Sequence, residues 1–199
     1  MLKDVIVGLL VGVVGFTLTS GIKGSRVQEE VTPTKQVVEV SKDVEALKTL
    51  AREVLPYEDK ARVDILYIDI VKGELEDKYT YIFDNEEESE FDNTLGFHDV
   101  SRDLIALETN DKDIRATFLH ELGHFVDKTY VEGVVDFKYS NSKEFVKAFE
   151  QEAITLYGEG AYPTTNVVEY FAQTFGDYVN KIDYSRLAPL TYKYIEGLF

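Results

Sequence analysis

His120-Glu121-Leu122-Gly123-His124 is the stretch from which the rest of this sequence can be interpreted. In a helix of 3.6 residues per turn, positions i and i+4 lie on one face, so His120 and His124 can reach the same metal ion. Glu121 is rotated by about 100°, which places its carboxylate beside that ion. The pattern indicates a Zn²⁺ site in which Glu121 takes a proton from a metal-activated water. Two surface histidines on an ordinary helix are the alternative.

Composition limits the kind of protein and the kind of metal site. With 199 residues, 44% of them hydrophobic, the chain can form one substantial core. The net charge of −16 makes a nucleic-acid partner unfavourable, because phosphates would be repelled, whereas a basic peptide would be attracted. The chain has no cysteine, which excludes disulfides, thiolate ligands and a cysteine nucleophile. Histidines and carboxylates must therefore hold any metal.

The amino terminus differs from the rest of the chain. Residues 5–22 contain no charged side chain, which is close to the shortest stretch that spans a membrane and also resembles a secretory signal. We expect residues 1–22 to be a membrane anchor or signal segment, 23–40 a linker, and 41–199 the folded domain. The domain is then extracytoplasmic and anchored through its N-terminal segment, or secreted.

Hydrophobic periodicity and turn residues predict the order helix, small sheet, helices, which is an α+β arrangement. We expect strands at Arg62–Val71 and Asp103–Glu108, with Tyr79–Phe83 as a hairpin partner of the first strand. The acidic residues between 84 and 92 indicate a solvated loop, with a cation site as the alternative. The helices are predicted from Ser41 to Pro56, from Asp111 to about Lys128 with Asn110 as cap, from the capping box Asn141/Glu144 to about Tyr157, from Asn166 to Asn180, and from near Pro189.

A catalytic zinc needs a third protein ligand and one open position. A third histidine soon after the motif is absent, because Asp127 and Tyr130 occupy the relevant positions, and His98 is interpreted as a loop residue. Glu169 lies in the apolar sequence Val-Val-Glu-Tyr-Phe-Ala, where a lone carboxylate would be costly to desolvate without a cation or hydrogen bonds. A helix-surface glutamate is the alternative at 169. The other downstream candidates lie on the polar face of a predicted helix and are interpreted as solvated: Glu144, Glu150 and Glu152.

Two further side chains have a candidate role near the metal. Asp127 lies three residues after His124 and could orient a histidine ring, or could be an exposed acid. Tyr162 precedes Glu169 by seven residues, and its phenol could donate to the oxygen that gains charge on the substrate carbonyl. Because the chain has 13 tyrosines, simple packing is the alternative for Tyr162.

These motifs resemble those of the lethal-factor-type zinc peptidases, which include the anthrax lethal factor catalytic domain and the Pro-Pro endopeptidases. The similar residues are the histidine motif with Asp127, Glu169-Tyr170-Phe171-Ala172 with Phe175, and the step from Tyr162 to Glu169. The chain departs from the family at Gln173, where members frequently carry an acid. The resemblance implies a zincin-like domain over residues 41–199, with the α+β arrangement above, behind the N-terminal hydrophobic segment.

For the site, the resemblance implies a gluzincin-like zinc metalloendopeptidase with one Zn²⁺ per chain. His120, His124 and Glu169 would be the metal ligands, Glu121 the general base and Tyr162 the oxyanion donor. A protein or peptide would be the substrate, and we expect its extended backbone to pair with the strand Leu104–Leu107. The other classes considered are a membrane-tethered, non-catalytic zinc-binding module and a hydrolase of cell-wall peptides.

Overall fold

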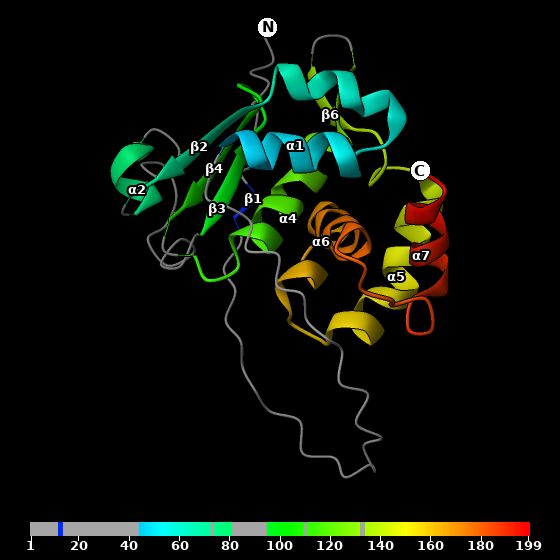
Figure 1. Cartoon of the computed structure of the whole chain (residues 1–199). Coiled ribbons are helices and arrows are strands. Elements are labelled where there is room, and N and C mark those ends of the chain that lie inside the picture. The colour runs from blue at the N-terminus through cyan, green and yellow to red at the C-terminus, as the bar shows by residue number, and fades with distance from the viewer. Residues whose placement is uncertain (1–11, 14–43, 73, 81–94, 110, 132–133) are drawn as a thin grey trace, which may run out of the picture.

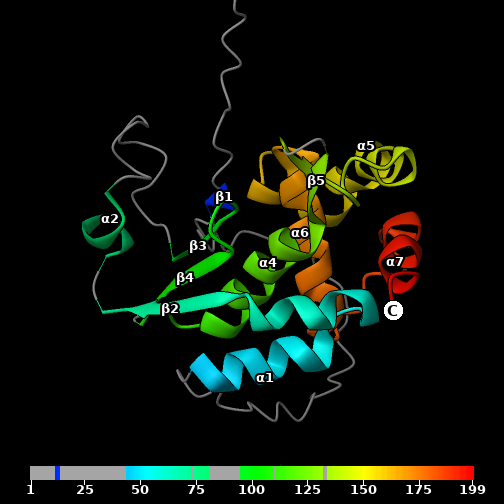
Figure 2. The ribbon, with the colours of Figure 1, turned by 90° about the horizontal axis from the view of Figure 1, so that it is seen from above.

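The computed structural model describes residues 12–13, 44–72, 74–80, 95–109, 111–131 and 134–199. A four-stranded sheet lies on one side of the molecule, and the helices α5 (Lys143–Tyr157) and α7 (Pro189–Glu196) lie on the other (Figure 1). Helices α4 (Ile114–Asp127) and α6 (Val167–Val179) lie between them, as Figure 2 also shows from above. A small sheet followed by packed helices confirms the predicted α+β class.

The sheet has the strand order β1-β3-β4-β2, with β1 at Gly12–Val13, β2 at Tyr67–Val71, β3 at Gly96–Asp99 and β4 at Leu104–Glu108. β4 pairs antiparallel with β3 and parallel with β2, so both of its edges are occupied. All five residues of β4 are buried, because apolar clusters cover both faces of the sheet. The strand predicted at Asp103–Glu108 is confirmed. The substrate strand predicted beside Leu104–Leu107 is wrong, since that strand is interior.

The predicted hairpin of residues 62–71 and 79–83 is also wrong in the described part of the chain. Residues Tyr57–Asp64 form the 3₁₀ helix η1, and the strand begins only at Tyr67. A short helix, α2 (Leu75–Lys78), follows β2, and residues 81–83 and the acidic residues 84–92 lie outside the described ranges. The partner of β2 is β4, more than thirty residues later, which a local pattern could not reveal.

The helices agree with the sequence prediction except at their first residues. α1 spans Val44–Val54 and is followed by the buried Pro56, while Ser41 lies outside the described residues. α4 begins at Ile114 with Asp113 as its cap, in place of Asn110, and α5 is capped by Ser142 in place of Asn141. Short polar side chains compete for the cap position, and the backbone path decides among them. α6 with its caps Asn166 and Asn180, and α7 beginning at Pro189, are confirmed.

Two features had no counterpart in the prediction. A hairpin of β5 (Lys128–Val131) and β6 (Val134–Phe137) follows α4, and its β-branched runs on either side of Glu132-Gly133 could have indicated it. Gly12–Val13 pairs antiparallel with Phe97 and His98 of β3. Among the described residues, no helix has the length and apolar character needed to cross a bilayer.

Candidate active site

Helices α4 and α6 cross closely because small residues lie where their backbones meet. A Cβ atom added to Gly123 would lie 2.7 Å from the Cα and 2.9 Å from the carbonyl oxygen of Ala172. A Cβ added to Gly176 would lie 3.3 Å from the backbone nitrogen of His120. The glycine inside the histidine motif is therefore the residue that lets the glutamate helix approach.

The crossing brings three donor atoms together in the interior. Nε2 of His120 lies 3.1 Å from Nε2 of His124 and 3.1 Å from Oε2 of Glu169. Nε2 of His124 lies 3.3 Å from the same oxygen. All three residues are buried, and in the described part of the chain they form the group of histidine and acidic side chains that could hold a metal ion.

These distances fit a tetrahedral ion. With metal–ligand bonds of about 2.0–2.1 Å, the ligand atoms of a tetrahedral Zn²⁺ site stand about 3.3–3.4 Å apart. The observed spacings of 3.1–3.3 Å are close to that edge length. Two imidazole nitrogens that face each other across a carboxylate oxygen need a cation or a proton between them. The donor set of two imidazoles and one carboxylate therefore suits zinc.

The start of helix α6 fixes the position of Glu169. Asn166 caps α6, and its side-chain oxygen accepts hydrogen bonds from the backbone nitrogens of Val168 and Glu169, each at 2.9 Å. Glu169 thus lies in the first turn, where the helix dipole favours a negative charge. The sequence-based alternative of a surface glutamate is excluded, since Glu169 is 2% exposed.

The charges of the group depend on one another. Burial opposes charge on His124, but the Glu169 carboxylate, with Glu121 and Asp127, raises the pKa of His124 to about 9. Burial also opposes ionisation of Glu169, yet the two imidazoles hold the pKa of that carboxyl well below its usual range. Burial lowers the pKa of His120, with Glu169 and Gln173 acting against it. Without a metal, the site therefore favours a proton shared near His124 and Glu169.

Glu121 is the unusual residue of this group. It is completely buried, and within the described part of the chain neither carboxylate oxygen has a hydrogen-bond partner. Burial raises the pKa of Glu121 to about 8, and charge on His124 acts to lower it. The backbone N–H of His98 acts in the same direction, although its geometry does not make a hydrogen bond to either carboxylate oxygen. An unpaired buried carboxyl is costly, so its retention beside the donor group points to a partner that arrives during function.

Two further residues that the sequence analysis named, Tyr162 and His98, lie in η2 and β3. Tyr162 lies in the 3₁₀ helix η2 (Tyr162–Thr164), and its ring centre is 6.3 Å from that of His120. The structure thus brings Tyr162 beside the candidate ligands. The interpretation of His98 as a loop residue is wrong, because it lies buried in β3 against the Phe125 ring and outside the ligand group.

Gln173, which the sequence marks only as a departure from the family, contacts one of the candidate ligands. Oε1 of Gln173 lies 3.1 Å from Nδ1 of His120, on the ring edge away from the other donor atoms. Gln173 follows Glu169 by four residues, so both lie on the same face of α6, and this spacing could have indicated the contact.

Two acids have structural roles. Asp127 is buried, contrary to the exposed alternative, and Oδ1 accepts hydrogen bonds from the backbone nitrogens of Tyr139 at 2.6 Å and Ser140 at 2.9 Å. Its hydrogen bonds that we observe go to backbone amides, not to a histidine ring. Glu152 was expected to be solvated and is buried instead, whereas Glu144 and Glu150 are exposed as expected.

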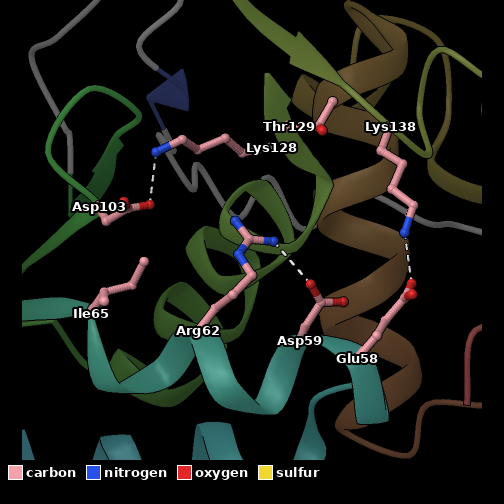
Figure 3. Close-up of a pocket in the computed structure, with 8 residues that line it drawn as sticks. All are labelled: Glu58, Asp59, Arg62, Ile65, Asp103, Lys128, Thr129 and Lys138. Atoms are coloured by element: carbon pink, nitrogen blue, oxygen red, sulfur yellow. Dashed lines mark hydrogen bonds and ion pairs between the residues drawn. The ribbon is translucent and has the colours of Figure 1, made fainter. Parts of the chain in front are cut away.

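The carboxyl end of α4 is held by Arg62 of η1, whose guanidinium donates to the carbonyl oxygens of Phe125 and Val126 and lies over the Phe125 ring. Beside it is a cavity of about 340 Å³ lined by residues of η1, β5 and the β3–β4 turn, with Ile65 after η1 and Lys138 after β6 (Figure 3). Six of its charged residues form three ion pairs: Arg62–Asp59, Lys128–Asp103 and Lys138–Glu58. None of the three candidate ligands lines this cavity.

A family model and a solved structure are similar to this chain. The family model described as anthrax toxin lethal factor, N- and C-terminal domain, matches residues 99–198, half of the chain, which includes α4 and α6. The solved structure of the Pro-Pro endopeptidase PPEP-2 from Paenibacillus alvei is similar with a TM-score of 0.49 and 19% identity, over 79% of this chain and 94% of that one. No curated protein sequence matches the chain. The chain therefore belongs to the anthrax toxin lethal factor family, the zinc metallopeptidases that its motifs resemble.

Proposed function

We propose that this protein is a zinc-dependent endopeptidase with Glu121 as its general base. The observation that carries the proposal is the buried, unpartnered Glu121 carboxyl next to three donor atoms spaced 3.1–3.3 Å apart. A site that only bound zinc would need the three ligands and would gain nothing from an unsatisfied acid beside them. This argument favours hydrolysis over a non-catalytic zinc-binding module.

His120, His124 and Glu169 would hold one Zn²⁺ per chain. When bound there, zinc supplies Lewis acidity, which lowers the pKa of water toward about 7 and polarises a peptide carbonyl. Two neutral imidazoles and one carboxylate leave one tetrahedral position for water or substrate. Zinc uptake would displace the proton that the metal-free site favours near His124.

Glu121 would take the proton from the attacking water and pass it to the leaving amine. Its pKa of about 8 in the metal-free protein lies near neutrality, where one carboxyl can serve first as base and then as acid. Zinc charge would lower that pKa and favour the ionised form that the first step needs. The Tyr162 hydroxyl would donate to the substrate oxygen as negative charge develops on it.

The substrate backbone would pair with the outer edge of β3. Support comes from Gly12–Val13, which pairs antiparallel with Phe97 and His98 at that edge, so an extended chain fits there. The same segment of β3 packs against the helix that carries Glu121, because the ring centres of His98 and Phe125 are 5.9 Å apart and Phe125 lies one turn after Glu121 in α4. The net charge of −16 would favour basic peptides.

We further propose that residues 1–22 anchor the protein in a membrane or direct its secretion, that residues 23–40 form a linker, and that residues 41–199 act outside the cytoplasm. The uncharged stretch 5–22 supports this arrangement. Pairing of Gly12–Val13 with β3 and insertion of the same residues in a bilayer would be mutually exclusive states of the chain.

The decisive experiment is a cleavage profile of the zinc-loaded full chain on a peptide library that includes cell-wall crosslink peptides. The controls are the protein treated with a chelator and the Glu121→Ala variant. We expect internal peptide bonds to be cut by the zinc-loaded protein alone. Undiminished cleavage by the Glu121→Ala variant would remove the general base, and cleavage confined to crosslink peptides would favour the cell-wall alternative.

A further inference from the structure

A chain of hydrogen bonds runs from His120 away from the candidate metal position. Nδ1 of His120 is 3.1 Å from Oε1 of Gln173, and Nε2 of Gln173 donates to Oδ1 of Asp177 at 3.0 Å. The Tyr157 hydroxyl donates to the other oxygen, Oδ2 of Asp177, at 2.7 Å. Three helices, α4, α6 and α5, thus contribute to one connected network.

The network fixes which way the amide of Gln173 points. Burial raises the pKa of Asp177, while the hydrogen bonds from Tyr157 and Gln173 act to lower it. The ionised carboxylate can only accept, so it faces the NH₂ group of Gln173. The amide oxygen then faces His120, and an oxygen in that place requires a proton on Nδ1 of the ring. A neutral imidazole protonated at Nδ1 has its lone pair at Nε2, the atom that faces His124 and Glu169.

We propose that Gln173, held by Asp177 and Tyr157, is the positioning residue that sets the tautomer and ring orientation of His120 for zinc. This inference rests on the proposed zinc site. A neutral amide contacts the histidine, and the carboxylate lies behind that amide, at Asp177, four residues later in α6. His120 thus keeps an oriented acceptor, and no carboxylate beyond Glu121 and Glu169 is added beside the two histidines.

The alternative arrangement, a carboxylate directly on His120, conflicts with Asp177. A glutamate at position 173 would set two carboxylates against each other at a spacing of about 3 Å, and one of them would have to bind a proton. The double substitution Gln173→Glu with Asp177→Asn exchanges the two groups. The new carboxylate at position 173 accepts from His120, and the new amide at position 177 donates to that carboxylate. This pair of substitutions is therefore the conservative rescue.

The test measures zinc affinity of the full chain by competition with a chelator, together with urea unfolding of the metal-free protein. Gln173→Met keeps the side-chain length and removes the acceptor, and we expect it to weaken zinc binding by about 10- to 100-fold. The control is Gln151→Met, the same substitution on the exposed face of α5, which should leave zinc affinity unchanged. The rescue pair should bind zinc more tightly than Gln173→Met does.

The role of Asp177 is tested by a double-mutant cycle. Asp177→Ala should weaken zinc binding in the wild-type background and add nothing in the Gln173→Met background, because it acts through the amide. A zinc dissociation constant of Gln173→Met within about threefold of wild type, or additive effects of the two substitutions, overturns the inference. If the wild-type protein binds zinc and cleaves peptides in that case, the proposed function stands. A wild-type protein that takes up no zinc overturns both.

Discussion

The α4–α6 pair and the α5–α7 pair both bury glutamates, and Glu121 of α4 and Glu152 of α5 have opposite surroundings. Glu152 of α5 accepts hydrogen bonds from the backbone nitrogens of Leu190 and Thr191 at the start of α7, each at 2.9 Å, and from the Thr191 hydroxyl at 2.8 Å. Glu121 of α4 is buried as deeply, and neither of its oxygens has a hydrogen-bond partner among the described residues.

The difference separates structural from functional burial. An acid that holds two helices together repays its desolvation through hydrogen bonds that exist in the resting fold. An acid kept for catalysis must leave its oxygens available to a water and a substrate.

The largest expected effect is on cleavage. Glu121→Gln keeps the side-chain shape and removes the base, and we expect peptide hydrolysis to fall by about 10²- to 10⁴-fold with zinc content unchanged. Glu152→Gln, the matched substitution, should leave the cleavage rate of the folded protein near that of wild type. It should instead lower the free energy of unfolding by about 1–3 kcal/mol, because an amide NH₂ would face a backbone N–H of α7. Cleavage rates and urea unfolding are measured for both variants. If the two substitutions had the same effect on cleavage and on stability, the functional role of Glu121 and the structural role of Glu152 would be contradicted.

The next effect is on metal retention. Glu169→Gln replaces a charged ligand with a neutral one, and the zinc dissociation constant should rise by more than the roughly 10- to 100-fold that loss of a ligand's hydrogen-bond partner costs. Glu150→Gln, on the exposed face of α5, is the control and should bind zinc as wild type does. Metal content after dialysis against a graded chelator gives the answer. Full zinc retention by Glu169→Gln would identify another ligand.

A smaller effect concerns how closely α4 and α6 pack. Gly123→Ala would force a methyl group to within 2.7–2.9 Å of the Ala172 backbone, which cannot yield as a side chain end can. We expect a loss of about 1–3 kcal/mol in the free energy of unfolding. Gly176→Ala meets its neighbours at 3.3–3.4 Å, and the roughly 1 kcal/mol helix preference of alanine should offset much of the strain. Urea unfolding that ranks Gly176→Ala as the more damaging substitution would contradict this crossing geometry.

The last expected effect is the pH dependence of the metal-free protein. His124 and Glu121, with pKa values of about 9 and 8, bind protons more tightly in the folded than in the unfolded state. Their stabilising contribution is complete at low pH and is lost as pH rises, through the range 4.5–8 for Glu121 and 6.5–9 for His124. Unfolding in urea with a chelator should therefore need less denaturant at pH 9 than at pH 6. The Glu121→Gln variant should show a weaker dependence, and a wild-type stability that rises over this range would contradict the assignment.

The sequence predicted the local parts of this fold well. The histidine helix, the Glu169 helix between Asn166 and Asn180 and the strand ending at Glu108 follow from periodicity and capping, which act over a few residues. It could not predict that β2 pairs with β4, or that Arg62 lies in η1 and binds the end of α4, because these depend on partners far along the chain. The alternation of apolar residues at 62–71 therefore predicts a strand that begins at Arg62, whereas β2 begins at Tyr67.

For the site, the sequence by itself determined the chemistry: two imidazoles and a carboxylate on one helix, and an acid in an apolar stretch of another, are fixed by residue type and by the 3.6-residue turn. Only the tertiary structure decided which groups meet. The glycine–alanine contact of Gly123 and Ala172 sets the helix separation that brings Glu169 to the histidines. Burial likewise depends on the whole fold, and both glutamates lie in helices. Only the tertiary structure shows that Glu152 is hydrogen-bonded to the start of α7 and that Glu121 has no hydrogen-bond partner among the described residues.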